Sequence, residues 1–218
     1  MSFTLLIVSL SILSYLMGSV PTALWYGLNY HGQDIRTLGS GNAGTTNAFR
    51  VFGRKAGCVV LFIDALKGFA AAFMGHALYL GEQVDKNTSM HLQIIFGFTA
   101  VIGHLLPIFC DFKGGKGVAT LLGMMLCLYP AAALIAVLVF VLVLSISHYA
   151  SLSSIAAALS LAAWLYFNPA QKGDSELLHY LGFSTSFLVI FTHRFNVVRL
   201  LQGRENKMYL FPKNRHLS

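Results

Sequence analysis

Charged side chains are scarce in this sequence of 218 residues, where Asp, Glu, Lys and Arg together make up 11% and hydrophobic residues make up 56%. A soluble globular domain usually carries about 25% charged residues. The shortage excludes an ordinary soluble domain and, with a mean hydropathy of +0.67, predicts a membrane protein. Acidic residues are the rarer sign, and the net charge is +7. The basic residues stand in short segments between apolar runs, so we expect them to report membrane topology and expect no nucleic-acid partner.

Cysteine is also rare. Cys58, Cys110 and Cys127 lie in or beside apolar runs and lack the spacing of a metal site. We therefore expect packing roles for them, no disulfide, no bound metal and no cofactor. No Lys or Arg precedes Arg36, so the apolar N-terminal segment lacks the charged region of a secretory signal peptide.

Apolar runs are abundant, and a membrane-spanning helix needs about 20 such residues. The sequence predicts an all-α polytopic membrane protein that forms a single domain over residues 1–218. We predict seven transmembrane helices at about 3–28, 57–80, 91–110, 118–129, 131–147, 151–167 and 177–193. Pro21 is a candidate kink in the first helix. The stretch 118–147 could instead be one long kinked helix, which would leave six spans.

The distribution of Lys and Arg favours the arrangement with seven spans. The loops at 81–90 and 168–176 carry only Lys86 and Lys172, beside several acidic residues. Apart from Lys67, which lies within the second predicted helix, the other basic residues cluster after the first predicted helix, at Lys113 and Lys116, and in the tail after residue 193. Seven spans with the N-terminus outside and the C-terminus cytoplasmic put every basic cluster in the cytoplasm. Six spans would put the C-terminal cluster outside.

Three polar stretches rich in glycine or serine precede the second, fourth and sixth predicted helices: "GSGNAGTTNAFR", "FKGGKGVAT" and "SHYASLSS". In the predicted topology these helices begin at the cytoplasmic face. A helix N-terminus carries a partial positive charge and free N–H groups, and glycine lets the backbone approach an anion closely. With Arg50 and Lys116 nearby, the stretches predict an anion site at the membrane surface. The candidate binding residues are Gly41, Asn42, Gly44, Asn47, Arg50, Gly114, Gly115, Lys116, Gly117, Ser151 and Ser154.

Two nucleotide-binding motifs are matched only in part. Residues 39–44 spell G-x-G-x-x-G, but the polar residues before them do not form the buried strand that a Rossmann unit requires. "GGKG" resembles a Walker loop, yet Gly117 stands where Ser or Thr must follow the lysine. We therefore expect phosphate binding without a nucleotide fold.

Four blocks of sequence together resemble the bacterial acyl-phosphate:glycerol-3-phosphate acyltransferases. They are "GSGNAGTTNAFRVFG", "GHLLPIFCDFKGGKGVAT", "SLSS" and "HRFNVVRLLQGREN", in the family's order. The resemblance implies a multi-pass enzyme of the bacterial inner membrane whose active site faces the cytoplasm. It implies acyl transfer from acyl phosphate to the sn-1 hydroxyl of glycerol 3-phosphate, giving lysophosphatidic acid and phosphate in the first step of phospholipid synthesis. Its implied partners are these two substrates and the lipid bilayer, with no obligate protein partner.

The resemblance also implies roles for individual residues. Ser40, His193 and Asn196 are the implied catalytic residues, and Glu205 matches a glutamate with a structural role. Arg50 and the residues at 114–117 match phosphate-binding positions. Either Ser151 or Ser154 matches a polar position before the sixth helix. Phe195 departs from the family's last motif, which often has glutamate there.

Other interpretations of these residues stay open. An anion transporter or channel would also use helix N-termini and basic residues, but it predicts ionisable groups near mid-bilayer, and the outer half has few. Asp64 and Lys67 stand three residues apart near the cytoplasmic end of a predicted helix. They are most simply a mutually neutralising pair. His104, at the inner end of the third predicted helix, could support the site from behind.

Overall fold

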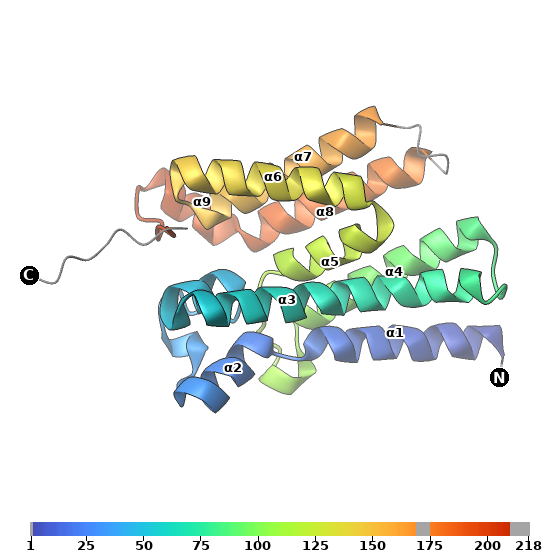
Figure 1. Ribbon diagram of the computed structural model, residues 1–218, viewed down its shortest axis with the longest axis horizontal. Helices are drawn as coiled ribbons and strands as arrows, with labels where there is room; N and C mark the ends of the chain where they lie inside the picture. Colours follow the sequence, from blue (N-terminus) through green and yellow to red (C-terminus); the bar gives the residue numbers. More distant parts are fainter. Residues whose placement is uncertain (1, 169–174, 210–218) are drawn as a thin grey trace, which may run out of the picture. The chain divides into compact units, whose positions relative to one another are not determined.

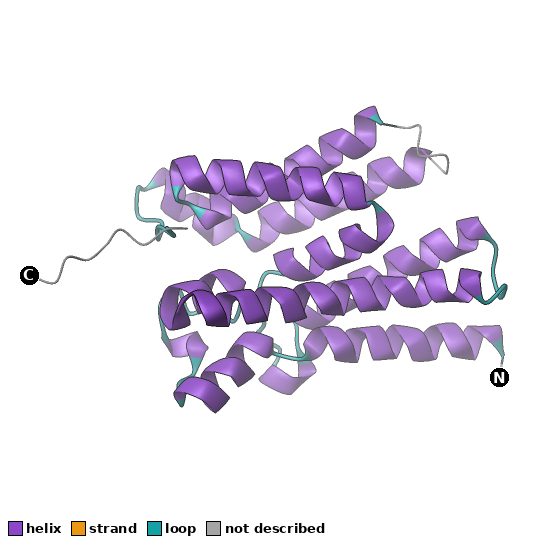
Figure 2. Cartoon of the chain, viewed as in Figure 1, coloured by secondary structure: helices purple, strands orange, loops and turns teal. Residues whose placement is uncertain are grey.

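The computed structural model describes residues 2–168 and 175–209, and in this part of the chain every regular element is helical (Figures 1 and 2). The α-helices are α1 (Phe3–Ser19), α2 (Thr22–His31), α3 (Thr45–Leu80), α4 (Lys86–Leu105), α5 (Val118–Leu128), α6 (Pro130–Ser147), α7 (Ala150–Phe167), α8 (Ser175–Thr192) and α9 (Arg194–Leu201). Two short 3₁₀ turns, η1 (Ile35–Thr37) and η2 (Ile108–Cys110), lie in the polar loops. The predicted all-α class is confirmed.

Four helices, α3, α4, α6 and α7, are each long and apolar enough to cross a membrane. The bent pair α1 and α2 would make a fifth span, and the apolar helices α5 and α8 are shorter. Every predicted segment therefore contains a helix of a multi-pass membrane protein. The number of spans and the direction of the termini stay predictions. Lys172, Asp174, Lys213 and Arg215, whose charges entered the topology argument, lie outside the described residues.

Proline ends two of the apolar helices where the sequence suggests. Helix α1 stops at Ser19, Val20 is extended, and α2 resumes after Pro21 at a bend of 40°. Proline has no N–H and its ring collides with the preceding turn, so the helix cannot run through it. At 118–147 the non-helical residue Tyr129 separates α5 from α6, which begins at Pro130. The structure thus has two helices at 118–147 with a break at Tyr129, and the choice between two spans and one kinked span stays open.

Helix α3 begins at Thr45, well before the predicted start at about 57. The polar residues at 45–50 hid this start, because they do not continue the apolar run. Gly53 interrupts the helix with φ 84° and ψ −172°, a backbone conformation that favours glycine. The kink separates a polar first part, which carries Asn47 and Arg50, from the apolar rest of the helix.

The chain divides into two compact units, residues 1–130 and 131–218, each described here by itself. In the first unit α3 packs against α4 and α5, and α4 packs against α1. Glycine allows close contact between α3 and α5. A Cβ on Gly68 would lie 1.9 Å from the Thr120 carbonyl oxygen, and one on Gly123 would lie 1.7 Å from that of Ala65. Small residues at helix contacts are typical of membrane proteins.

The second unit is built on α7 and α8, and the short helix α9 contacts both. Leu161 and Leu165 of α7 and Leu178 and Leu181 of α8 are buried. Along α8 the rings of Phe183, Phe187 and Phe191 are exposed, at 62%, 70% and 52%. Such an aromatic ridge is unfavourable in water and fits contact with lipid.

Candidate functional site

Asn47 holds the backbone of the first polar loop, residues 35–44, in its conformation. This side chain is 1% exposed, and its amide nitrogen donates to the carbonyl oxygens of Ile35 and Leu38 at 3.2 and 2.9 Å. Its oxygen accepts from the Ser40 N–H at 3.0 Å and from Arg50 Nη1 at 3.3 Å. Asn47 therefore lies beneath the loop, where it organises the backbone, and Ser40 is exposed on the loop's surface.

Glycines let the first loop turn this tightly. Gly39 and Gly41 have φ of 60° and 71°, in the left-handed region. A Cβ on Gly39 would lie 2.4 Å from the oxygen of Asn47, so a side chain there would break the hydrogen bonds just described. Gly44 is the N-cap of α3 and has no side chain to cap it. The first N–H groups of α3 thus donate to no side chain at the N-cap, as in helix N-termini that bind anions.

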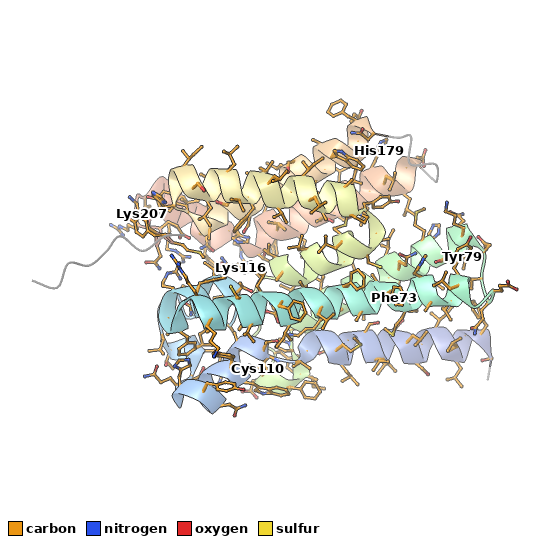
Figure 3. All side chains as sticks on the ribbon, viewed as in Figure 1. Phe73, Tyr79, Cys110, Lys116, His179 and Lys207 are labelled. Carbon is orange, nitrogen blue, oxygen red and sulfur yellow. The ribbon has the colours of Figure 1, made fainter. Side chains whose placement is uncertain are left out.

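The second polar loop leads from the end of α4 through η2 to α5. Its Gly115 N–H donates to the carbonyl oxygen of His104 at 3.2 Å. Gly117, with φ 77°, is the N-cap of α5, again without a side-chain cap. Lys116 is half-buried and stands directly before Gly117, and Cys110 is the last residue of the η2 turn within this loop (Figure 3).

The structure brings the two polar loops of the first unit together. A Cβ on Gly115 would lie 3.2 Å from the carbonyl oxygen of Ala43, so the backbones of the two loops are neighbours. Arg36 Nη1 lies 3.4 Å from Cys110 Sγ, which in turn lies 3.5 Å from the Lys113 carbonyl oxygen. The predicted phosphate-binding residues of the first and second stretches therefore belong to one local arrangement.

An ion pair fixes the side of the first loop. Arg36 donates to both carboxylate oxygens of Asp34, with Nη2 to Oδ2 at 2.7 Å. The hydrogen bond from the Arg36 side chain is the largest influence on the Asp34 carboxyl and lowers its pKa. The charge of Arg36 is thus paired with the nearby Asp34, and this ion pair stabilises the conformation of the first loop.

A second ion pair lies deep in the first unit. Lys67 Nζ is 2.6 Å from Asp64 Oδ1, and both side chains are buried. Asp64 Oδ1 also accepts from Thr22 Oγ1 at 2.8 Å, and Lys67 donates to the Val20 carbonyl oxygen at the break between α1 and α2. The predicted mutual neutralisation of Asp64 and Lys67 is confirmed.

In the second unit, Glu205 is the centre of a hydrogen-bond network. Its Oε1 accepts from Ser151 Oγ at 2.9 Å and from Asn196 Nδ2 at 2.6 Å, and its Oε2 accepts from Arg199 Nε at 2.8 Å. Ser154, by contrast, donates to the Ala150 carbonyl oxygen of its own helix at 2.8 Å. The network ties α7 and α9 to the segment after α9 through one carboxylate.

The environment of Glu205 favours its charged form. Desolvation is the largest single influence and raises the pKa of the carboxyl. The hydrogen bonds from Asn196, Arg199 and Ser151, with the charge of Arg199, together outweigh it, and the pKa is lowered. Glu205 is therefore an ionised structural acceptor, and as a weak base it is poorly suited to take up a proton.

His193 separates α8 from α9 and does not lie within a helix. Its side chain is 3% exposed, and its Nδ1 lies 2.8 Å from the Val189 carbonyl oxygen. A carbonyl can only accept, so Nδ1 carries the proton, and in the neutral ring Nε2 is the acceptor. The atom that orients the ring at Nδ1 is thus a neutral carbonyl and not a carboxylate.

Sequence reasoning missed several contacts that shape these clusters. The organising role of Asn47, the ring of His104 beside Gly115 and the three-fold coordination of Glu205 depend on distant residues. No group of three or more His, Cys, Asp or Glu side chains that could hold a metal occurs in the described part of the chain. The available chemistry is anion binding by backbone and cationic groups in the first unit, and hydrogen bonding by buried polar side chains in the second.

Comparisons with known proteins agree with one another. The profile of a family described as glycerol-3-phosphate acyltransferase matches residues 8–203. The glycerol-3-phosphate acyltransferase of Listeria welshimeri is 40% identical over 205 residues, covering 94% of this chain and 98% of the relative. That of Chlorobaculum tepidum is 40% identical over 227 residues, covering 93% and 97%.

Two solved structures are also similar, both of PlsY, an integral membrane glycerol 3-phosphate acyltransferase. Its glycerol 3-phosphate form superposes with a TM-score of 0.78 at 35% identity, covering 93% of this chain and 96% of that one. Its lysophosphatidic acid form gives a TM-score of 0.77 at 33% identity, covering 93% and 95%.

Proposed function

Because this chain belongs to the glycerol-3-phosphate acyltransferase family, we propose that it transfers an acyl group from acyl phosphate to the sn-1 hydroxyl of glycerol 3-phosphate. The products are 1-acylglycerol 3-phosphate, or lysophosphatidic acid, and inorganic phosphate. The observation that carries the proposal is the family match over residues 8–203. The similar structures, whose forms are those with glycerol 3-phosphate and lysophosphatidic acid, support this acceptor and product.

The proposed reaction needs no covalent enzyme intermediate, because acyl phosphate is a mixed anhydride and is already activated. The glycerol hydroxyl oxygen attacks the acyl carbon, an ester C–O bond forms, and the acyl C–O bond to phosphate breaks. The hydroxyl proton leaves on the released phosphate. A phosphate monoester has its second pKa at about 6, so the substrates themselves bring a base suited to neutral pH. We therefore favour proton removal by the substrate.

The first unit supplies the groups suited to holding phosphate. Both substrates carry one, and the uncapped starts of α3 and α5 present N–H groups beside two glycine-rich loops. Arg50 and Lys116 add positive charge, and Ser40 and the N–H groups near it steady the acyl phosphate. In this proposal Gly41, Asn42, Gly44 and Asn47 provide or shape the first loop, and Gly114, Gly115 and Gly117 the second.

The second unit supplies groups suited to orienting the acceptor. His193 offers Nε2, because its Nδ1 proton points to the Val189 carbonyl, and Asn196 is fixed by Glu205. Nε2 can accept a hydrogen bond from a hydroxyl without removing its proton. His193 and Asn196 therefore position glycerol 3-phosphate. In this proposal Ser151, which also donates to Glu205, is the serine that takes part, whereas Ser154 donates to a carbonyl oxygen of its own helix, α7.

The proposal includes a membrane arrangement. Seven spans, with the N-terminus outside and the C-terminus inside, put the polar loops at the cytoplasmic face of a bacterial inner membrane. The acyl chain then stays in lipid while the phosphates meet cytosolic water. In a cysteine-free background, cysteine at position 85 should react with an impermeant reagent in sealed cells, and cysteine at 42 should be protected. Labelling at position 42 would refute the orientation.

The test of the activity is phosphate release by the purified protein in detergent. With palmitoyl phosphate as donor, release should require glycerol 3-phosphate and should match lysophosphatidic acid formation one to one. The same acyl group offered as a coenzyme A thioester should give far less product. Activity with the thioester alone would contradict the donor assignment. Absence of turnover, with phosphate movement across vesicles made from the same protein, would favour an anion transporter instead.

His193 distinguishes positioning from general base catalysis. His193→Asn and His193→Gln keep hydrogen bonding without a titratable group, so a substantial fraction of turnover should remain, while His193→Ala should be crippled. A positioned base contributes roughly 10²–10⁴-fold. If both polar variants fall as far as alanine, and lose a titration near neutrality that the wild-type rate shows, the base assignment is correct.

A further inference from the structure

His104, near the end of α4, lies between the buried ion pair and the second glycine loop. Its Nδ1 is 3.8 Å from Asp64 Oδ1, and its Nε2 faces Gly115. A Cβ added to Gly115 would lie 2.3 Å from that Nε2, so the imidazole occupies the space that a side chain at 115 would need. The main-chain oxygen of His104 also accepts from the Gly115 N–H at 3.2 Å. One residue thus contacts Gly115 through both its ring and its backbone.

The carboxylate beside His104 is held firmly. Asp64 Oδ1 accepts from Lys67 and from Thr22, and Lys67 is tied to the Val20 carbonyl oxygen. These contacts join α2, α3 and the break before α2 around one buried atom. Asp64 is therefore held in place by three elements of the first unit, and it gives the His104 ring a well-ordered neighbour.

Charge balance makes the neutral imidazole the stable form. Asp64 and Lys67 already neutralise each other, and His104 is 8% exposed. A protonated His104 would leave one uncompensated positive charge in a buried setting, which is unfavourable. His104 is thus suited to packing and weak polar contact, and it contacts the loop backbone rather than a reacting atom.

We propose that His104 is a positioning residue for phosphate binding: backed by Asp64, its ring holds Gly115 in the conformation in which the 114–117 loop binds phosphate. The proposal rests on the function proposed above for that loop. Without the ring, the loop gains alternative conformations, and the apparent affinity falls by the fraction of time spent in the competent one. A loop that is competent about one-tenth of the time binds phosphate about tenfold more weakly.

The glycine loop itself provides a double-mutant test. In Gly115→Ala the new methyl collides with the His104 ring, and removal of the ring relieves that collision. In Gly114→Ala the methyl meets main-chain atoms instead, 2.0 Å from the His104 carbonyl oxygen and 2.7 Å from that of Leu105. Truncation of the His104 side chain cannot relieve this second collision. Gly114→Ala is therefore the matched control, and coupling is expected only with Gly115.

The experiment measures the Kd of inorganic phosphate by calorimetry for the full-length protein in detergent, with turnover followed separately. His104→Ala should raise the Kd about tenfold. It should also lower the unfolding temperature, because a buried ring is removed, so binding is compared at a temperature where the variant is folded. His91→Ala, an exposed histidine of the same helix, should change neither. In the His104→Ala background, Gly115→Ala should weaken phosphate binding much less than it does in the wild type. Gly114→Ala should weaken phosphate binding by the same factor in both backgrounds.

Several results would overturn the proposal. These are no measurable phosphate binding by the wild type, an unchanged Kd in folded His104→Ala, or a Gly115→Ala effect that is the same with and without the ring. If His104→Ala does not fold, His104→Gln must weaken phosphate binding while it retains the wild-type unfolding temperature. Phosphate binding without any acyl transfer would contradict the proposed activity and still leave the Kd comparison to decide the role of His104.

Discussion

The two units of this protein build polar clusters in different ways. In the first unit the groups on offer are mostly backbone: two loops with glycine at left-handed positions run into uncapped helix starts, and Asn47 and His104 support them from beneath. In the second unit the groups are side chains, and a single carboxylate, Glu205, arranges Ser151, Asn196 and Arg199. Backbone donors suit an anion of fixed shape, whereas side-chain amides and imidazoles suit a hydroxyl that must be oriented.

This difference predicts different failures. Loss of Lys116 in the first unit should weaken phosphate binding and leave the fold intact, because the loop backbone keeps its own hydrogen bonds. Loss of Glu205 in the second unit should affect the fold as well, because three side chains would lose their shared acceptor.

The largest expected effect is that of Lys116→Ala on phosphate binding. A charge-assisted contact is worth about 1.5–3 kcal/mol, so the apparent Michaelis constants should rise roughly 10- to 100-fold, or turnover should be lost. Arg50→Ala should behave alike. Lys113→Ala is the control, since this exposed lysine has the same charge three residues away. Equal, small effects of all three would mean that the charges serve topology only.

An effect of similar size, but on stability, is expected for Glu205→Ala. The substitution removes the acceptor of Ser151, Asn196 and Arg199 from a side chain that is 6% exposed. Hydrogen bonds to a charged group contribute about 1.5–3 kcal/mol, and the unfolding free energy should fall by about that amount. Thermal unfolding in detergent measures it. Unchanged unfolding with lost turnover would instead give Glu205 a direct part in the chemistry.

The charge of Glu205 also predicts a pH dependence. Its pKa is lowered in the folded protein from an ordinary value of 4.5, so its stabilising contribution is fully present above about pH 4.5. The contribution is lost as the pH falls from there through the lowered folded value. The wild-type unfolding temperature should approach that of Glu205→Gln in this acidic range. A difference between the two that stays constant down to the lowest pH would contradict this assignment.

The smallest effect separates two serines of α7. Ser151→Ala removes a donor to the Glu205 carboxylate and should lower both stability and activity measurably, by about 1 kcal/mol. Ser154→Ala removes only a bond to the carbonyl oxygen of Ala150 in the same helix, and a change within about 0.5 kcal/mol is expected. Kinetics and unfolding of the pair decide between them. A larger loss in Ser154→Ala would reverse the assignment.

Much of the fold follows from local sequence. Apolar runs locate the helices, and Pro21 and Pro130 locate two breaks, because proline acts on its own turn of the chain. The start of α3 is harder to see, since Thr45, Thr46 and Asn47 break the apolar pattern although the backbone is already helical. Periodicity reports burial in this case, and a polar first turn carries no apolar signal.

The candidate site residues can be predicted from local sequence, but the contacts that hold them in place cannot. Glycine and basic residues before a helix indicate an anion site by themselves, so the candidate residues can be named. Their supports depend on contacts across the chain: Ser151 and Glu205 are 54 residues apart, and our proposal of Ser151 over Ser154 rests on that contact. The ring of His104 beside Gly115 is likewise a tertiary fact, since neither residue predicts the other.

The most direct measurement of the division of roles is the binding of inorganic phosphate to two variants, with turnover measured in parallel. Lys116→Ala should weaken phosphate binding at least about tenfold. His193→Ala should keep near wild-type affinity for phosphate and yet lose about 10²-fold in turnover, as expected when the acceptor is misplaced. Phosphate affinity that falls equally in both variants, or that stays unchanged in Lys116→Ala, would contradict the assignment of phosphate to the first unit and of the acceptor hydroxyl to the second.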